Sequence, residues 1–534
     1  MSAPHVASAH WSGPSTAGLW AGIAAGGVVF GGWALLDGLN LAPFPPLAGA
    51  DWFIQHAPGT LATTAIERLG SNAQRALVIT IAVVGAAFMA FLGYVVSGAS
   101  APWVRRLVFA PVAVIVIAAT AESLAQAIFQ AALLLAAGIF YEHMLARLEA
   151  QASTSNATPP DNWLDQPGTL GRREALVHGL AIGAAALVFG SAGGWLLRRA
   201  NVRQPPTLAG HDLSEIRVML APAAAAADVP DAASSFDGFD APPDLRDRFT
   251  PIDRFYVVDA AVRDPRVVET DWTLRVHGAV ERELTLSYAD LLALPAVELD
   301  GTLMCISFEY ENNLISTTRW TGVPLGEIIR LAVPLPGVAD VALHGVDDYS
   351  DSIPLAKALE PTTLAAYGMG GETLTREHGF PCRAFVPNLY GIKNVKWLRE
   401  IELVEYDFRG FWQERAWTDV AEINTISMID TPWQEAVRDE EGALWVAGMA
   451  FAGTRGIGRV ELSIDDGPWQ PVELEPYAPQ LIWQRWRYRW RPEAGTHSLT
   501  VRAADLAGEP QPSVSRPPHP DGLTGLDRIE VRIL

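Results

Sequence analysis

Residues 376–398 have the sequence REHGFPCRAFVPNLYGIKNVKWL, which gathers most of the groups that this chain can offer to an anion. The chain contains three lysines, and two of them fall here beside a histidine and an arginine: His378, Arg383, Lys393 and Lys396. Arginine offers a planar fork and lysine a point charge to a phosphate, and Gly391 lets the backbone approach a ligand closely. Backbone amides around Asn394 could complete a phosphate nest. The stretch predicts a phosphate-binding loop, with a solvent-exposed basic loop as the alternative.

A second informative stretch is GTLMCISFEYENNLISTTRWTGVPL, residues 301–325. It places Cys305 after an apolar run typical of a strand and before a polar, irregular segment. A thiol at the end of a strand, facing a loop, suits a soft metal ligand or a nucleophile. From the residue alone, a buried and inert cysteine is the commoner explanation.

The segments around these stretches, over residues 246–408, mix strand and helix patterns. Residues 272–280 alternate in polarity as a strand does, and residues 381–387 and 398–406 are also typical of strands. Ser287 is a good N-cap for a short helix, and Pro324 suits the start of another. We therefore expect an α+β domain.

Residues 409–534 are nearly all strand in pattern. Two alternating runs flank Asp465-Asp466-Gly467, which indicates a hairpin, and further short strands follow at regular spacing. This pattern predicts an immunoglobulin-like β-sandwich. Its Trp- and Arg-rich strand at residues 481–492 is either an interface or a well-packed sandwich face.

The N-terminal third predicts a membrane domain. Uncharged apolar runs occupy residues 18–36, 76–96, 107–121, 123–141 and 175–197. Runs of about 20 apolar residues are typical of membrane-spanning helices. We expect five spans over residues 1–200, or four if residues 107–141 form one long helix. Residues 201–245, rich in Ala, Pro, Asp and Ser, predict a flexible linker.

Charge and cysteine content exclude several classes of function. The formal net charge is −21, and residues 1–200 hold equal numbers of acidic and basic residues, so the whole excess lies in residues 201–534. The negative charge of residues 201–534 does not suit nucleic-acid binding, which needs a basic surface. Two cysteines exclude a disulfide framework, a zinc finger and a cysteine-ligated iron–sulfur cluster.

Taken together, the two stretches resemble the molybdopterin-binding domain of the sulfite oxidase family. The patterns that carry this resemblance are MCIS…LISTTRWTGVPL and HGFPxRxxVPxLYGxKxVKWLxxIEL, and it covers about residues 250–408. Residues 409–534 are similar to that family's immunoglobulin-like dimerisation domain, and the N-terminal region resembles anchors of some bacterial members. The resemblance implies a molybdenum-molybdopterin cofactor, with one protein cysteine completing the sulfur ligands of the metal.

The resemblance also implies roles for single residues. Cys305 matches the metal-ligating cysteine, whereas Cys382 stands where the family has an aliphatic residue and is expected in the core. The positions that match cofactor-binding residues are Phe255, Tyr256, Gly345, His378, Arg383, Asn394, Val395 and Lys396. Tyr349 resembles the active-site tyrosine, and Arg455 loosely matches a substrate-binding arginine. A structural loop tyrosine and an ordinary surface arginine are the alternatives for these two.

Three departures from the family bear on the substrate. They are Val258-Asp259 in place of an Arg-Asn pair, Phe308 in place of an asparagine, and the acidic run of Asp347, Asp348 and Asp351. An anionic substrate would lose one arginine and meet carboxylates instead. The resemblance therefore implies the cofactor but leaves sulfite doubtful as the substrate.

These observations predict a membrane-anchored, molybdenum-dependent oxidoreductase that moves an oxygen atom to or from a small sulfite- or sulfoxide-like substrate. No haem domain is fused, so a separate cytochrome or quinone would carry the electrons, and the second domain favours a homodimer. Arg172-Arg173 faintly resembles a twin-arginine export signal, which would place the catalytic domains outside the cytoplasmic membrane of a bacterium. The alternative is a non-catalytic, membrane-tethered scaffold that keeps the fold.

Overall fold

The computed structural model describes residues 15–39, 41–57, 61, 65, 73–98, 111, 113–118, 124–154, 184, 209–210, 239–476 and 480–534. The N-terminal helices form one compact unit, and the described residues from 209 onward belong to another. Each unit is described by itself below.

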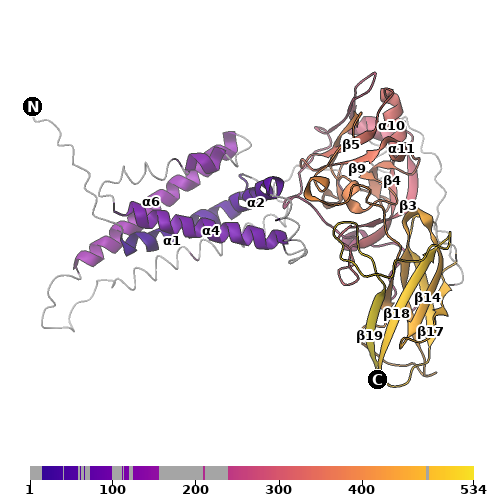
Figure 1. Ribbon diagram of the computed structural model, residues 1–534. Helices are drawn as coiled ribbons and strands as arrows, with labels where there is room; N and C mark the ends of the chain where they lie inside the picture. The colour runs from indigo at the N-terminus through magenta and orange to yellow at the C-terminus, as the bar shows by residue number, and fades with distance from the viewer. Residues whose placement is uncertain are drawn as a thin grey trace, which may run out of the picture. The chain divides into compact units, whose positions relative to one another are not determined.

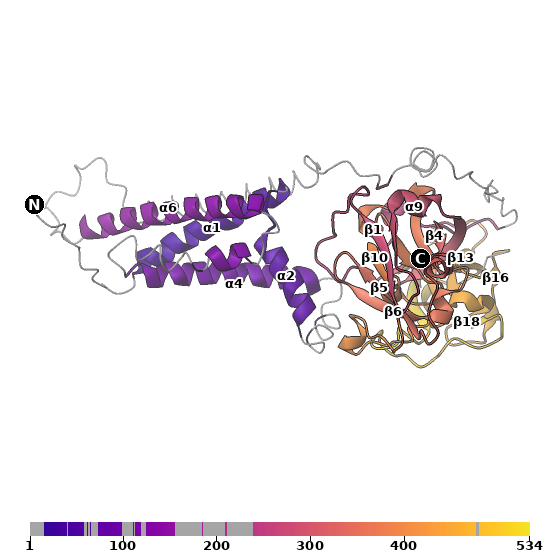
Figure 2. The same ribbon diagram turned by 90° about the horizontal axis from the view of Figure 1, so that it is seen from above.

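The N-terminal unit is helical. Its longer described helices are α1 (Thr16–Gly38), α2 (Pro45–His56), α4 (Ala73–Val96) and α6 (Leu124–Thr154). Helix α1 contacts both α4 and α6, and the three lie side by side in Figures 1 and 2. A glycine permits this close packing, because a Cβ atom on Gly22 would lie 2.8 Å from the Met89 carbonyl oxygen.

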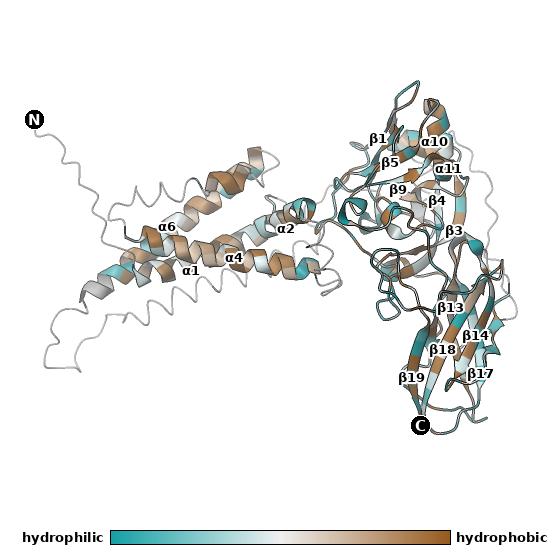
Figure 3. Cartoon of the chain, viewed as in Figure 1, coloured by the Kyte–Doolittle hydropathy of each residue, from teal (hydrophilic) through white to brown (hydrophobic). Residues whose placement is uncertain are grey.

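Three of these helices are long and apolar enough to span a membrane: Thr16–Gly38, Ala73–Val96 and Leu124–Glu149. Hydrophobic residues predominate along α1 and α4 (Figure 3). The three helices match the apolar runs at residues 18–36, 76–96 and 123–141. Of the run at 107–121 the structure describes residues 111 and 113–118, which are helical, and of the run at 175–197 it describes residue 184. Most of the expected linker lies outside the described residues.

Two sheets build the α+β part of the second unit. The first has the order β2-β1-β10-β5-β6, of which β1, β10, β5 and β6 are seen side by side in Figure 2. Its strands are β1 (Thr273–Gly278), β2 (Leu284–Ser287), β5 (Asp340–Gly345), β6 (Ser350–Pro354) and β10 (Leu398–Val404). The second sheet has the order β3-β4-β7-β8, with β9 also paired to β7. Its strands are β3 (Val297–Met304), β4 (Ile315–Pro324), β7 (Leu364–Met369), β8 (Glu372–Thr373) and β9 (Arg383–Phe385).

Short helices pack on these sheets, and α9 and α10 lie where the sequence predicted helices. Helix α9 (Tyr288–Ala293) begins with a capping box, in which Ser287 and Asp290 each accept a backbone hydrogen bond from the other. Helix α10 (Leu325–Ala332) follows Pro324, and α11 (Leu355–Ala358) follows Pro354. Apolar residues of α9 and α10 join one core cluster with strand residues of both sheets. Three one-turn helices complete this part: η2 (Ile252–Arg254), η3 (Arg376–His378) and η4 (Gly391–Lys393).

The C-terminal part is β-rich and contains two further sheets. One has the order β11-β13-β17-β16, and the other β12-β19-β18-β14-β15. The strands of the first are β11 (Ile426–Thr431), β13 (Leu444–Phe451), β16 (Glu473–Leu474) and β17 (Gln484–Trp490). Those of the second are β12 (Glu435–Ala436), β14 (Ile457–Ile464), β15 (Gln470–Pro471), β18 (Gly495–Asp505) and β19 (Asp527–Ile533). Residues of both sheets, such as Trp486 and Val501, share one buried cluster. The immunoglobulin-like assignment stays a prediction.

The predicted hairpin lies between β14 and β15, which pair antiparallel. Asp465 and Asp466 in its turn both have positive φ, at 51° and 56°. These angles are typical of the tight turns that match the twist of two antiparallel strands. Two one-turn helices, η5 (Gln413–Arg415) and η6 (Gly453–Arg455), lie on either side of β11 and β13 in the chain.

Candidate cofactor site

One cavity, of about 90 Å³, brings together most of the predicted site residues. Its walls come from the segment after η2, the end of β3, the β5–β6 turn, η3, β9 and η4 with the residues that follow it. The predicted residues that line it are Tyr256, Cys305, Tyr349, His378, Arg383, Asn394 and Lys396. Residues more than 100 positions apart in the sequence therefore meet in one site.

Cys305 lies in the cavity wall directly after β3, at the strand-to-loop junction that the sequence predicted. Its amide donates a 2.9 Å hydrogen bond to the Leu314 carbonyl oxygen, and its side chain is a buried free thiol. Burial raises the pKa of this thiol, while hydrogen bonds from Ser307 lower it. A positive metal at the sulfur would therefore be needed to favour the thiolate.

The C-terminal part fixes the turn that carries Cys305. Met304, Ile306 and Phe308 are buried in one cluster with Phe451 and Trp483. This explains why an apolar residue stands at position 308, since its ring is fully buried there. The thiol thus points into the cavity while its neighbours are held by packing.

Arg383 is a buried cation whose described partners are backbone carbonyls. Its guanidinium donates to the carbonyl oxygens of His378 at 3.1 Å and Asn394 at 3.2 Å, and it lies over the Trp320 ring. Burial lowers its pKa to about 10. A buried charge is costly unless it is paired, so this site favours an anionic ligand.

His378 lines the same wall, and its Nε2 atom is buried without a hydrogen-bond partner among the described residues. Burial, together with the nearby charges of Arg383 and Lys396, lowers its pKa to about 3. Phe255 packs edge-to-face against the imidazole, with ring centroids 5.2 Å apart. Phe255 therefore orients the histidine from the core side rather than lining the cavity, whereas its neighbour Tyr256 does line it.

The segment after η4 supplies the rest of the basic wall. Lys396 forms a buried ion pair with Asp259 and donates a 2.8 Å hydrogen bond to the Glu377 carbonyl oxygen. The Asn394 side chain holds the loop by accepting from the Val386 amide at 2.7 Å. Val395 is buried in the core and does not line the cavity. Gly391 comes close to Cys305, because a Cβ atom there would lie 3.6 Å from the Cys305 Cα.

The β5–β6 turn places two polar groups in the cavity. Tyr349 and Asp347 both line it, and Gly345 sits at the base of the turn, where its amide donates to the Tyr349 carbonyl oxygen at 2.8 Å. Burial raises the pKa of Asp347 to about 6. Of the acidic run, Asp347 alone lines the cavity; Asp348 is an exposed partner of Arg399, and Asp351 is fully buried.

Some residues lie elsewhere than the sequence suggested. Arg455 does not line the cavity: it donates to the Ile423 carbonyl oxygen at 2.9 Å and lies 3.4 Å from an Asp505 carboxylate oxygen. Lys393, grouped above with the basic residues of the loop, is instead buried in ion pairs with Asp351 and Asp419. Cys382 is in the core, as expected.

Sequence reasoning missed Trp412, which lines the cavity from beyond the boundary predicted at residue 408. The aromatic pair Phe411-Trp412 after a glycine was the available signal, and nothing in its spacing pointed to the site. Val258 and Ile392 add apolar surface to the same wall.

The donor set fits a metal that arrives inside a larger, phosphate-bearing cofactor. Among the described residues, no group of three or more His, Cys, Asp or Glu side chains could hold a metal ion by itself. The cavity offers a single thiol, with three basic side chains on the same wall: His378, Arg383 and Lys396. One soft ligand and one anion cradle suit a cofactor that brings the other metal ligands with it. The fold and the cavity together define a protein that binds an anionic, metal-carrying cofactor.

Comparisons of the sequence with known proteins agree with this class. Residues 261–412 match the family model described as oxidoreductase molybdopterin binding domain. Mitochondrial sulfite oxidase of Homo sapiens is 30% identical over 302 residues, covering 47% of this chain and 55% of that protein. The uncharacterized oxidoreductase YuiH of Bacillus subtilis is 34% identical over 166 residues, covering 31% of this chain and 77% of YuiH. The sulfane dehydrogenase SoxCD structure from Paracoccus pantotrophus aligns over 54% of this chain and 82% of that chain, at 21% identity and a TM-score of 0.48.

The chain belongs to the sulfite oxidase family of molybdopterin-dependent oxidoreductases. It is thus an oxidoreductase, and its cofactor is molybdenum-molybdopterin. The chain spans about half the length of human sulfite oxidase, the first of these relatives.

Proposed function

We propose that this protein is a membrane-anchored oxidoreductase that transfers an oxygen atom to or from a small neutral substrate, such as a sulfoxide. The observation that carries the proposal is the shared cavity. One buried thiol, one tyrosine and a basic cradle line it together: Cys305, Tyr349, His378, Arg383 and Lys396. When bound, the cofactor supplies a metal that cycles by two electrons and exchanges one oxygen atom with the substrate.

In this proposal each residue has one task. Cys305 provides the protein sulfur to the metal, and His378, Arg383 and Lys396 hold the pterin phosphate. Tyr349 keeps its hydroxyl at the cavity wall, where its oxygen can hold or release a proton next to the bound substrate.

The charges of the cavity support a neutral substrate. Asp347 lines it, and with a pKa raised to about 6 its carboxyl is mostly ionised at neutral pH. Asp259, in place of the asparagine of sulfite oxidases, also lines the cavity and offsets part of the positive charge of Lys396 through an ion pair. A dianion such as sulfite would be repelled by Asp347, and at an effective dielectric constant near 20 this repulsion amounts to a few kcal/mol.

Substrate preference is tested with the purified full chain, made in a host that produces the cofactor. We expect kcat/KM for dimethyl sulfoxide reduction to exceed kcat/KM for sulfite oxidation by about tenfold or more. Asp347→Asn should narrow this ratio by raising sulfite turnover. A wild-type preference for sulfite would contradict the neutral-substrate assignment. Protein that carries neither molybdenum nor pterin would support the alternative, a membrane-tethered scaffold.

The three long apolar helices support multi-pass anchoring. We further propose that the catalytic part lies outside the cytoplasmic membrane of a bacterium and that a separate cytochrome or quinone carries the electrons. Both native cysteines are buried, so a single engineered cysteine reports its own surroundings. Ser234→Cys in intact cells should react with an impermeant thiol reagent. Protection of this cysteine until the cells are lysed would overturn the outward placement. The proposed homodimer is tested by measuring the mass of the detergent-solubilised protein.

A further inference from the structure

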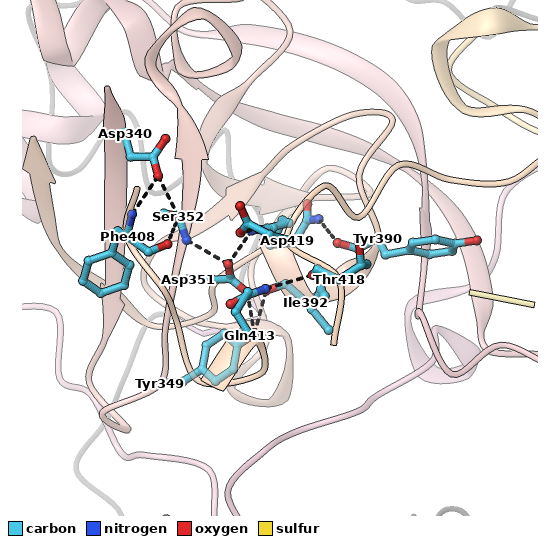
Figure 4. Close-up of polar contacts among 12 residues, drawn as sticks. Asp340, Tyr349, Asp351, Ser352, Tyr390, Ile392, Phe408, Gln413, Thr418 and Asp419 are labelled. Atoms are coloured by element: carbon cyan, nitrogen blue, oxygen red, sulfur yellow. Dashed lines mark hydrogen bonds and ion pairs between the residues drawn. The ribbon is translucent and has the colours of Figure 1, made fainter. Parts of the chain in front are cut away.

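The hydroxyl of Tyr349 joins the cavity to a set of buried polar groups behind it. It donates a 2.6 Å hydrogen bond to the Ile392 carbonyl oxygen and lies 3.3 Å from the Asp351 carboxylate. In Figure 4 the contacts of Tyr349, Gln413 and Ser352 converge on Asp351. Asp351 is therefore the first group behind the cavity wall that can exchange a proton with Tyr349.

Beyond Asp351, charged groups alternate in sign as far as the protein surface. The Lys393 ammonium lies 2.8 Å from the Asp351 carboxylate and 2.9 Å from that of Asp419. The side chains of Asp351 and Lys393 are 0% and 2% exposed, whereas that of Asp419 is 40% exposed. One end of this series thus meets the cavity and the other meets water.

We propose that Asp351, Lys393 and Asp419 form a proton path between Tyr349 and the solvent. The inference rests on the proposed function, because oxygen-atom transfer that draws its oxygen from water must release protons from the cavity. A purely structural ion pair would need Lys393 and one carboxylate. The second carboxylate, at the surface, is what turns the pair into a route to the solvent.

The protons and electrons of the proposed reaction balance with this route. In the oxidative direction one water breaks both O–H bonds: its oxygen goes to the substrate, two protons leave, and two electrons pass to the separate cytochrome or quinone. For each proton, Lys393 passes one to the Asp419 carboxylate, which releases it to water. Tyr349 passes one to the Asp351 carboxylate, which returns it to Lys393, and Tyr349 takes up the proton that leaves the water in the cavity. Every group returns to its starting charge, and in the reductive direction the steps run backwards.

Among the described residues, this is the one charged route that leads away from Asp351. The Asp351 carboxylate accepts hydrogen bonds from the Ser352 backbone amide at 2.8 Å and from the Gln413 side-chain amide at 3.3 Å. Neither of these donors carries a charge. Asp340 lies beyond Ser352 and accepts from the Phe408 amide at 3.0 Å. Asp347 lies on the cavity side of Tyr349, so it is not part of the path from Tyr349 to the solvent. Among the described residues, Lys393 is the cation in contact with Asp351.

The first test changes the outer end of the path, where the fold is least at risk. Asp419→Asn should slow the proton-coupled step of turnover by about tenfold or more, with a larger solvent deuterium effect. Asp419→Glu, or added formate with Asp419→Asn, should restore the rate. The matched control is Asp348→Asn, an exposed carboxylate 3.2 Å from Arg399 and outside the path, which should behave as wild type. Loss of rate that neither Glu nor formate restores would indicate a structural role and overturn the path.

The second test needs no turnover, so it separates failure of the path from failure of the proposed function. The chain has three lysines, so full-length protein labelled with 15N at lysine Nζ gives a spectrum simple enough to assign Lys393. If the path exists, the Lys393 ammonium protons exchange with water despite their burial, and Asp419→Asn slows this exchange by about tenfold. Exchange that is equally slow in the wild type and in Asp419→Asn would overturn the path, whatever the substrate is.

Discussion

The Arg383 guanidinium donates a 3.1 Å hydrogen bond to the carbonyl oxygen of His378, the residue whose imidazole forms the neighbouring part of the cavity wall. This bond places a buried cation beside a buried, neutral imidazole. Burial lowers the pKa of both groups, which indicates that the positive charge is poorly solvated before a ligand arrives. The phosphate of the cofactor would supply the missing counter-charge.

Replacing Arg383 with methionine should therefore separate cofactor binding from stability. We expect Arg383→Met to lose nearly all bound molybdenum and pterin, while the unfolding temperature of the cofactor-free protein stays the same or rises, because a poorly solvated charge is removed. The matched control is Arg319→Met, since Arg319 is paired with Asp300 at 2.7 Å. That variant should keep the cofactor and lose stability. Normal metal content in Arg383→Met would contradict the cradle.

The two cysteines should respond in opposite ways to removal. Cys305→Ala should leave the fold intact but abolish metal retention and turnover, because it deletes the one thiol of the cavity. Cys382→Ala removes a buried sulfur from the core and should cost about 1 kcal/mol of unfolding free energy while the metal is retained. Elemental mass spectrometry and denaturant unfolding of both variants measure this. Metal bound at the wild-type level in Cys305→Ala would end the ligand assignment.

Motif-bearing positions could be predicted from the sequence, whereas the partners of their side chains could not. Cys305 at the end of a strand and the Ser287 cap depend on local sequence, and both hold in the structure. Lys393 and Lys396 are three residues apart and have similar neighbours in the sequence. Lys396 nevertheless lines the cavity, whereas Lys393 is buried against Asp351. That difference comes from strand β6 and from Asp419, which no local pattern links to position 393. Trp412 was missed for the same reason.

Of the two glycines in residues 376–398, Gly379 should tolerate substitution less well. Its φ is +105°, and a Cβ atom there would lie 3.1 Å from the Cβ atoms of Arg383 and Lys396. Gly379→Ala should therefore cost more than the roughly 1 kcal/mol typical of a positive φ alone, and it should lower cofactor content by displacing both cations. Gly371 is the control, because its φ is +87° but no atom lies within 4 Å of the added methyl group. Equal losses of stability in the two variants, measured by denaturant unfolding, would show that the contact is unimportant.

Asp347 should make stability depend on pH in a definite direction. Burial raises its pKa from 3.8 to about 6, so the folded state binds this proton more tightly than the unfolded state. Its contribution to stability is therefore present below about pH 4, is lost as the pH rises through about 6, and stays lost above that. Asparagine at this position has no carboxyl group to ionise, so its stability contribution does not fall as the pH rises. Asp347→Asn should match the wild type at pH 4 and exceed it at pH 8, by at most about 3 kcal/mol.

The measurement is denaturant unfolding of both proteins across this pH range, with Asp348→Asn as the control. Asp348 is exposed, so its substitution should change the free energy of unfolding only slightly. Asp527, whose pKa burial also raises to about 6, is present in every variant, so its titration cancels from the differences. A wild-type protein that is more stable than Asp347→Asn at pH 8 would mean that the carboxylate is stabilised in the folded state. The carboxylate would then lack the unpaired charge by which the cavity is proposed to repel a dianion.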